Sequence, residues 1–234
     1  MSKLAVITGG TKGIGRAVVE KFAAGGYDII TCSRKQADLE VLRKTLTAKY
    51  SIGVEVFAAD LSVQSQAHGF TSFVLQQNRP VDVLVNNSGV FIPGQVTEEP
   101  DGTLQSLVEA NLYSAYHTTR GLVPGMKKEC SGHIFNMCSI ASIKAYPNGG
   151  SYAISKFALL GFTKVLREEL KEFGIRVTAV LPGATRTSSW DAVKLPEERF
   201  IKPEDIADAI FDAHALSPRS VVEEILIRPQ LGDI

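Results

Sequence analysis

The chain has 234 residues, and its 25 Lys and Arg residues balance 25 Asp and Glu residues to give a formal net charge of +0. Hydrophobic residues make up 44% of the sequence, which argues against a disordered chain. Zero net charge excludes a global attraction to nucleic acid or to an anionic membrane, because both need an excess of Lys and Arg on one face. Any cationic site must therefore be local.

Disulfides and targeting segments are not expected. The three cysteines, Cys32, Cys130 and Cys138, form an odd and sparse set, which favours a reducing compartment. The apolar run at 4–7 is too short for a signal peptide, and no apolar stretch reaches the roughly 18–20 residues of a spanning helix. We therefore expect a cytoplasmic protein with neither membrane nor nucleic acid as a partner.

Short apolar runs alternate with segments of helical periodicity along the whole chain. The apolar runs predict strands at 4–8, 28–33, 54–58, 81–86, 133–138, 176–181 and 223–227. The periodic segments predict helices at 14–24, 36–49, 62–78, 104–128, 151–173 and 204–216. This order predicts an α/β fold class: a single doubly wound Rossmann-type domain whose mainly parallel seven-stranded sheet has helices on both faces.

No composition change or low-complexity tract divides the chain, so we expect one domain spanning residues 1–234. The longest irregular segments are 87–100 and 182–202, and both follow the carboxyl ends of predicted strands. Ligands bind at that edge of a doubly wound sheet. The second segment predicts a short substrate lid at about 184–203.

The first predicted strand is followed by the glycine-rich segment TGGTKGIG at positions 8–15. Glycines let the backbone approach a pyrophosphate, and the unpaired N–H groups at a helix start attract it. A tight turn without a ligand is the alternative, but a place at the start of a β/α series favours a dinucleotide. Because Gly13 follows Lys12, the segment does not match the Walker pattern.

The second predicted strand ends in TCSRK at positions 31–35, with no acid. NAD binding places Asp or Glu there to accept from the ribose 2′-hydroxyl, whereas the 2′-phosphate of NADP needs cations. Ser33 and Arg34 can donate from one side, and Lys12 adds a positive charge from the other. Solvated surface charges are the alternative interpretation. We expect NADP(H) as the cofactor.

Tyr152 and Lys156 lie four residues apart near the start of the predicted helix at 151–173, which places them on one helix face. A nearby ammonium favours the phenolate, so we expect Lys156 to lower the pKa of Tyr152 toward neutral pH. Taken alone, the pair is also compatible with an ordinary aromatic residue and a solvated lysine.

Together these motifs resemble the short-chain dehydrogenase/reductase family over essentially the whole chain. In chain order, the matches are the glycine motif at Thr8, Gly9, Gly13 and Gly15, the adenine-contacting acid at Asp60, the structural turn at 86–89, the catalytic set Asn111, Ser139, Tyr152 and Lys156, and the segment at 182–187. Ser88 stands where the turn commonly has alanine. The segment at 221–229 is closer to the pattern of short-chain reductases that act on hydroxy acids and assorted carbonyls, and the short lid predicts an open site.

The resemblance implies the residues that bind the cofactor. They are Gly9, Thr11, Lys12, Gly13, Ile14, Gly15, Ser33, Arg34, Asp60, Leu61, Asn87, Gly89, Tyr152, Lys156, Pro182, Gly183, Thr185 and Thr187.

The resemblance also implies roles for the catalytic set. Tyr152 would protonate a carbonyl oxygen as NADPH delivers hydride to the carbon, and Ser139 would donate a hydrogen bond to that oxygen. Lys156 would bind the nicotinamide ribose, and Asn111 would support a water relay.

The function expected from the resemblance is NADPH-dependent reduction of a ketone or 3-oxoacyl carbonyl to a secondary alcohol. The chain resembles 3-oxoacyl-[acyl-carrier-protein] reductases and related NADP-dependent carbonyl reductases, so the substrate is a small molecule or an acyl thioester. An alcohol or hydroxy-acid dehydrogenase working in the oxidative direction is one alternative. A dinucleotide-sensing regulator without relevant catalysis is another.

The family also implies a homodimer or homotetramer built on the helices at 104–128 and 151–173. The second helix has apolar Leu159, Leu160, Phe162, Val165 and Leu166, although a fully buried core helix would show the same pattern.

Other signals are weaker. Cys130, His133 and Cys138 lack a fourth ligand at a zinc spacing, so no metal is expected. His68, His117 and His214 stand alone on predicted helices, where surface or capping roles are expected. Phe91, Tyr146 and Trp190 fall on segments near the predicted site, and for each of them a packing role and a place in the substrate pocket stay equally open.

Overall fold

The computed structural model describes residues 2–190 and 194–234, so residues 191–193 of the predicted lid lie outside the described residues. The strands are β1 (Leu4–Thr8), β2 (Asp28–Ser33), β3 (Val54–Ala58), β4 (Val83–Asn86), β5 (Gly132–Met137), β6 (Ile175–Pro182) and β7 (Glu224–Ile227). The α-helices are α1 (Gly13–Ala24), α2 (Gln36–Lys49), α3 (Gln64–Leu75), α4 (Thr103–Val108), α5 (Ser114–Glu129), α6 (Gly150–Leu170) and α7 (Pro203–Ala215).

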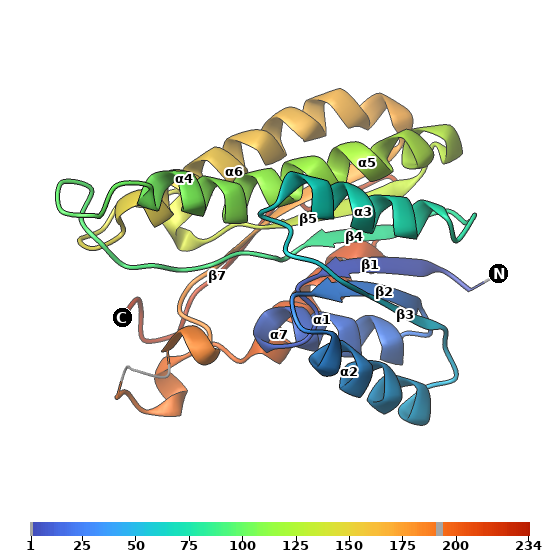
Figure 1. Ribbon diagram of the computed structural model, residues 1–234, viewed down its shortest axis with the longest axis horizontal. Coiled ribbons are helices and arrows are strands. Elements are labelled where there is room, and N and C mark those ends of the chain that lie inside the picture. Colours follow the sequence, from blue (N-terminus) through green and yellow to red (C-terminus); the bar gives the residue numbers. More distant parts are fainter. Residues whose placement is uncertain (1, 191–193) are drawn as a thin grey trace.

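The strands form one sheet in the order β3-β2-β1-β4-β5-β6-β7 (Figure 1), and neighbouring strands pair in parallel throughout. The predicted α/β class and doubly wound sheet are confirmed. Along β1, residues Leu4–Thr8 are buried throughout, as expected for a strand covered on both faces. Within the described residues, no helix is long and apolar enough to cross a membrane.

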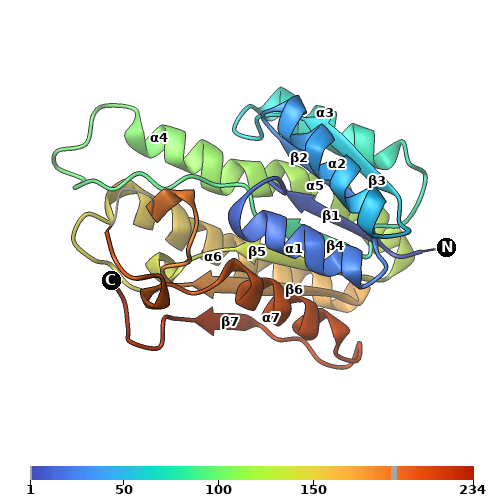
Figure 2. The same cartoon turned by 90° about the horizontal axis from the view of Figure 1, so that it is seen from below.

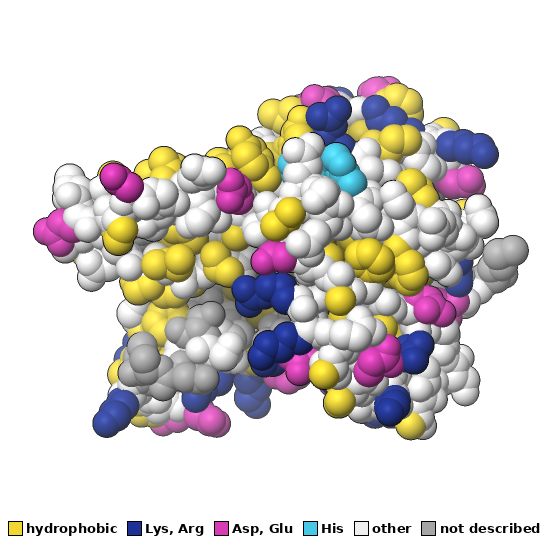
Figure 3. Space-filling view, viewed as in Figure 1, with side chains coloured by type: hydrophobic (Ala, Val, Ile, Leu, Met, Phe, Trp, Pro, Cys, Tyr) yellow, Lys and Arg dark blue, Asp and Glu magenta, His cyan; other side chains and the backbone are white. Residues whose placement is uncertain are grey.

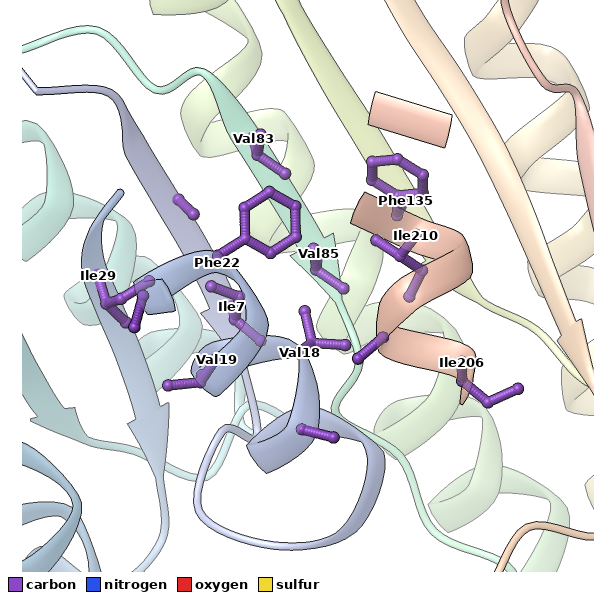
Figure 4. Close-up of a cluster of buried hydrophobic side chains, with 14 of the residues drawn as sticks. Ile7, Val18, Val19, Phe22, Ile29, Val83, Val85, Phe135, Ile206 and Ile210 are labelled. Atoms are coloured by element: carbon purple, nitrogen blue, oxygen red, sulfur yellow. The ribbon is translucent and has the colours of Figure 1, made fainter. Parts of the chain in front are cut away.

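Helices cover both faces of the sheet. Figures 1 and 2 show α1, α2 and α7 on one face and α3, α5 and α6 on the other. On the first face, side chains of α1 and α7 meet the middle strands in one apolar cluster (Figure 4). Phe22 of α1 and Ile210 of α7 are both fully buried there. A large apolar side chain buried in this way contributes about 1.5–3 kcal/mol to stability, so the cluster holds both helices to the sheet.

The predicted helix at 104–128 is interrupted. Its first part is α4, its second is α5, and a single π-helical turn, Glu109–Tyr113, joins them. A π turn adds one residue to the helical repeat and often marks a functional position. Asn111 lies in this turn and is completely buried.

The three histidines that stand alone in the sequence have neighbours in the fold, although His68 is exposed, as a surface role requires. The rings of His68 on α3 and His117 on α5 are in edge contact, with centroids 5.5 Å apart. Nε2 of His214 lies 2.9 Å from the hydroxyl of Tyr27, and its ring is 5.6 Å from that of His133. Helix packing brings together residues that are distant in sequence. The spacing of the histidines along the chain therefore could not predict which rings are in contact.

The apolar positions of α6 divide between the two alternatives left open by the sequence. Leu159, Leu160 and Leu166 are buried within the chain, while Val165 is 55% exposed. Much of the apolar pattern on this helix therefore belongs to the core.

The sheet order reverses beside β1, where the chain crosses from β3 to β4 on the opposite side. Segments leaving the carboxyl ends of β1 and β4 therefore diverge, and a crevice opens between them. This geometry positions the candidate site.

Candidate active site

A cavity of about 620 Å³ lies at the carboxyl ends of the strands. Every predicted cofactor-binding residue lines it, as do the predicted catalytic residues Ser139, Tyr152 and Lys156. Asn111 is not among the lining residues. In Figure 3 the surface is hollowed between the two helical layers, and Lys and Arg side chains lie beside the hollow. The local cationic site expected from the neutral net charge is therefore present at this cavity.

The turn that follows β4 supports the glycine-rich loop between β1 and α1 through side-chain hydrogen bonds to its backbone. Gly9 and Gly13 have φ of +69° and +53°, in the left-handed region that favours glycine. The amide Nδ2 of Asn87 donates to the carbonyl oxygens of Thr8 and Gly9 at 2.9 and 3.2 Å. A Cβ atom at Gly15 would collide with the Asn87 amide and with the Gly9 carbonyl. The loop is thus an open, preformed cradle at a helix start, and it fits a pyrophosphate.

Cations line the cavity at the end of β2. Lys12, Ser33 and Arg34 all border it, as expected for a site that takes a ribose 2′-phosphate. Asp38 on α2 also lines the cavity, and its Oδ2 lies 3.6 Å from Nζ of Lys12. Sequence reasoning missed Asp38 because it considered only the end of the strand.

The segment after β3 forms a side-chain-supported turn. Oδ1 of Asp60 accepts hydrogen bonds from the backbone N–H and the hydroxyl of Ser62, at 3.0 and 2.7 Å. This arrangement fixes the Asp60 carboxylate and presents Asp60 and Leu61 to the cavity.

The segment after β6 lines another side of the cavity. Pro182 ends the strand, and the hydroxyl of Thr185 donates to the Gly183 carbonyl at 3.0 Å. Thr187 approaches the glycine loop so closely that a Cβ at Gly13 would lie 3.0 Å from its methyl group.

The predicted lid is partly ordered by its own contacts. Thr185 and Ile201 form a parallel bridge, and short 3₁₀ turns occupy Ser188–Trp190 and Glu197–Arg199.

Ser139 follows β5 and starts a single 3₁₀ turn, Ile140–Ser142, as its capping residue. Its Oγ accepts from the Ala141 N–H at 3.1 Å, while its own N–H donates to Oγ of Ser142 at 3.1 Å. With one lone pair engaged by Ala141, the hydroxyl proton of Ser139 stays available to donate to an oxygen in the cavity. The cap therefore sets the orientation of the serine.

Tyr152 and Lys156 face the cavity from the first two turns of α6. Burial raises the pKa of Tyr152 to about 12, although a hydrogen bond with Ser139 opposes the rise. Burial likewise lowers the pKa of Lys156 to about 8. Lys156 Nζ donates to the Met137 carbonyl at 2.8 Å and lies 5.8 Å from the centroid of the Tyr152 ring.

The expected lowering of the Tyr152 pKa by Lys156 is therefore not found. Desolvation of the phenolate is the largest cause of the raised pKa, and the hydrogen bond with Ser139 offsets only part of it. A phenol with a pKa of about 12 is protonated at neutral pH, so Tyr152 is poised to donate a proton.

Asn111 lies behind the cavity and fastens the segment that follows β4. Its Oδ1 accepts from the Val90 N–H at 2.7 Å, and its Nδ2 donates to the Val90 carbonyl at 3.0 Å and to Oγ of Ser155 at 2.9 Å. A Cβ atom at Gly89 would lie 2.8 Å from Oδ1 of Asn111. The π turn places this amide where it holds both backbone groups of Val90.

Aromatic residues form the wall beyond Tyr152. Phe91, Tyr146 and Trp190 all line the cavity, so all three residues left open by the sequence lie at the site. The ring of Phe91 meets that of Tyr152 edge to face at 4.8 Å and stacks on that of Trp190 at 6.2 Å.

Sequence reasoning missed an ion pair that lines the cavity. Nζ of Lys144 lies 3.2 Å from Oδ2 of Asp233, and both residues line the cavity. These residues lie 89 positions apart, and no local pattern marks them.

Comparison with known proteins agrees with this geometry. The family model described as short chain dehydrogenase matches residues 3–198. Sepiapterin reductase of Chlorobaculum tepidum is 32% identical over 242 residues, which cover 100% of this chain and 99% of that protein.

Solved structures are also similar. Alcohol dehydrogenase from Thermococcus sibiricus, complexed with 5-hydroxy-NADP, has a TM-score of 0.92 at 27% identity and covers 98% of this chain and 97% of its own. L-Sorbose reductase from Gluconobacter frateurii, complexed with NADPH and L-sorbose, has a TM-score of 0.90 at 27% identity, with coverages of 97% and 95%. The resemblance inferred from the motifs is confirmed, and the chain belongs to the short-chain dehydrogenase family of oxidoreductases.

Proposed function

We propose that this chain is an NADPH-dependent reductase that converts a ketone or 3-oxoacyl carbonyl to a secondary alcohol. The observation that carries this function is the arrangement of Ser139, Tyr152 and Lys156 around one cavity that also has the glycine cradle. Arg34 and Lys12 favour NADP(H) over NAD(H), and the similar solved structures described above contain NADPH or an NADP derivative.

NADPH, when bound, supplies the hydride that reaches the carbonyl carbon. The glycine cradle and the cations at the end of β2 would hold its phosphates, and Lys156 its nicotinamide ribose. Ser139 donates a hydrogen bond to the substrate oxygen, which stabilises the charge that develops there. Tyr152 then gives its phenol proton to that oxygen, leaving an alcohol and a phenolate beside the Lys156 ammonium.

The raised pKa of Tyr152 means that the form present at neutral pH is the phenol, from which reduction starts. Reduction needs a protonated phenol, and a group with a pKa of about 12 is in that form at neutral pH. Oxidation of an alcohol needs the phenolate as a base, which burial disfavours. The oxidative dehydrogenase is therefore the second candidate, and the non-catalytic regulator is the third.

The substrate end of the cavity gives some indication of substrate class. Its aromatic wall of Phe91, Tyr146 and Trp190 suits a substrate with an apolar or planar body next to the carbonyl. Sepiapterin reductase and L-sorbose reductase are reductases by name, which supports the direction and leaves the substrate to be measured.

Two further parts of the proposal concern assembly and location. Ile154, Phe157 and Val165 of α6 are 43%, 46% and 55% exposed, which is an apolar face suited to a second copy in a homodimer or homotetramer. Light scattering measures that state. Cys32, Cys130 and Cys138 are unpaired, which supports a cytoplasmic location.

The decisive experiment is a carbonyl panel assayed with NADPH and NADH in parallel. We expect turnover with NADPH, and we expect Tyr152→Phe to abolish it while the Kd for NADPH changes little. Unchanged turnover in Tyr152→Phe contradicts the proposed acid. A preference for NADH contradicts the assignment of Lys12 and Arg34.

A further inference from the structure

The helix that presents Tyr152 has no capping side chain of its own. Its N-cap residue is Gly149, and its first turn has no acidic residue. The carboxylate of Glu99, which belongs to the segment between β4 and α4, supplies the cap instead. Oε1 of Glu99 accepts from the Ser151 N–H at 2.9 Å, and Oε2 accepts from the Ser151 hydroxyl. An anion at this point also offsets the positive end of the helix dipole.

The two segments fit closely around this contact. Gly150 has φ of +41°, and a Cβ atom there would collide with Oε1 of Glu99 and with the Gly94 carbonyl. The Gly94 N–H also donates to the Asn148 carbonyl at 3.0 Å. Figure 2 shows the segment before α4 and the start of α6 at the same end of the molecule. Glycine at position 150 therefore leaves the room that the carboxylate occupies.

The segment that carries Glu99 also touches the reactive tyrosine directly. Asn111 holds its beginning through both backbone groups of Val90. The next residue, Phe91, places its ring against the edge of Tyr152 at 4.8 Å. Glu99 then fastens the far part of the segment to Ser151, which immediately precedes Tyr152. The segment is thus held at two points, one on each side of the tyrosine.

We propose that Glu99 is a positioning residue for Tyr152, a role that rests on the reductase function proposed above. Through Ser151, its carboxylate sets where the first turn of α6 lies and hence where the Tyr152 hydroxyl meets Ser139. A misplacement of about 1 Å in such a group can cost about 100-fold in rate. Glu99 does not line the cavity, so its removal acts on the proton donor and not on cofactor binding.

Two variants test this role. Glu99→Ala removes both acceptors, and we expect kcat to fall on the order of tenfold while the KM for the carbonyl and the Kd for NADPH change little. Glu99→Gln keeps one oxygen for the Ser151 N–H but cannot accept from the hydroxyl through its amide nitrogen, so it should restore part of kcat. Glu98→Ala is the matched control, because Glu98 is the exposed neighbour on the same segment.

A second measurement does not depend on turnover. Amide hydrogen exchange at Ser151 should be faster in Glu99→Ala than in the wild type, and the Tyr152 ring resonances should shift, while Glu98→Ala changes neither. A folded Glu99→Ala protein with unchanged Ser151 exchange, or with kcat within twofold of the wild type, overturns the inference. Absence of turnover in the wild-type protein would instead contradict the proposed function, and the exchange measurement would still decide the role of Glu99.

Discussion

The buried histidines at the amino-terminal edge of the sheet predict a loss of stability in mild acid. His133 on β5 is fully buried, and its Nε2 lies 2.8 Å from Oγ1 of Thr178. Because Thr178 gives its own proton to the Val222 carbonyl, its oxygen accepts from His133, which assigns the Nε2–H tautomer. Among the described residues, Nδ1 of His133 has no hydrogen-bond partner. A second proton would therefore enter a buried position without an acceptor.

The size of this effect follows from the pKa of His133. Burial lowers that pKa from 6.5 to about 2, with Arg176 and His214 adding repulsion. A lowered histidine pKa means that the unfolded chain binds the proton more readily, so stability is lost as the pH falls below 6.5. At pH 5 the pH lies about 1.5 units below the unfolded value, which costs about 2 kcal/mol at 1.36 kcal/mol per unit. His214, whose pKa burial lowers to about 4, adds a smaller loss because it is partly exposed.

Urea unfolding at pH 7.5 and pH 5.0 measures this difference, since carboxyl groups such as Asp28, whose pKa is lowered from 3.8, respond mainly at lower pH. In His133→Gln the loss between the two pH values should shrink by about 2 kcal/mol, because Gln does not titrate. Thr178→Val, the control, keeps the imidazole buried and should retain the wild-type difference. If His133→Gln loses as much stability as the wild type, the assignment of the acid response to His133 is wrong.

Two predictions concern the cavity. Burial lowers the pKa of Lys156 to about 8, so its ammonium is lost as the pH rises through that value. We therefore expect kcat/KM for NADPH to fall above pH 8. A flat pH profile between pH 7 and pH 9.5 would contradict this role of Lys156. Arg34→Ala should raise the Kd for NADPH about 10- to 100-fold and change the Kd for NADH little. Asp38→Asn removes the carboxylate that pairs with Lys12, so it should lower the Kd for NADPH. Fluorescence titration measures both Kd values, and equal effects on the two cofactors would refute the assignment of Arg34 and Lys12.

The fold was predictable where burial leaves a local pattern. The first three strands, Leu4–Thr8, Asp28–Ser33 and Val54–Ala58, have the bounds predicted from the sequence. The π turn at Glu109–Tyr113 was not predictable, because one additional residue in a helical repeat does not change which side chains are apolar. The sequence therefore predicts one continuous helix at 104–128, where the structure has two helices joined by the π turn.

The candidate site was predictable to the extent that its residues lie in short motifs. Nearly all of them line one cavity, although their individual roles stay predictions. The pKa of Tyr152 was predicted in the wrong direction, since the spacing to Lys156 shows proximity but not desolvation. Glu99 was missed because its partner Ser151 lies 52 residues away, and only the fold brings them together.

The amino and carboxyl ends of the strands affect different properties of the protein, namely stability in acid and the candidate site. At the amino end of β5, the buried imidazole of His133 lowers the stability of the fold at acidic pH, and His133 does not line the cavity. At its carboxyl end, Ser139 is held by a local cap. The proposed donors Ser139 and Tyr152 thus lie at capped turns, whereas Phe91 and Trp190 lie on the connecting segments. Substrate choice can therefore change through those segments without moving the chemistry, provided that Glu99 and Asn111 keep the first segment in place.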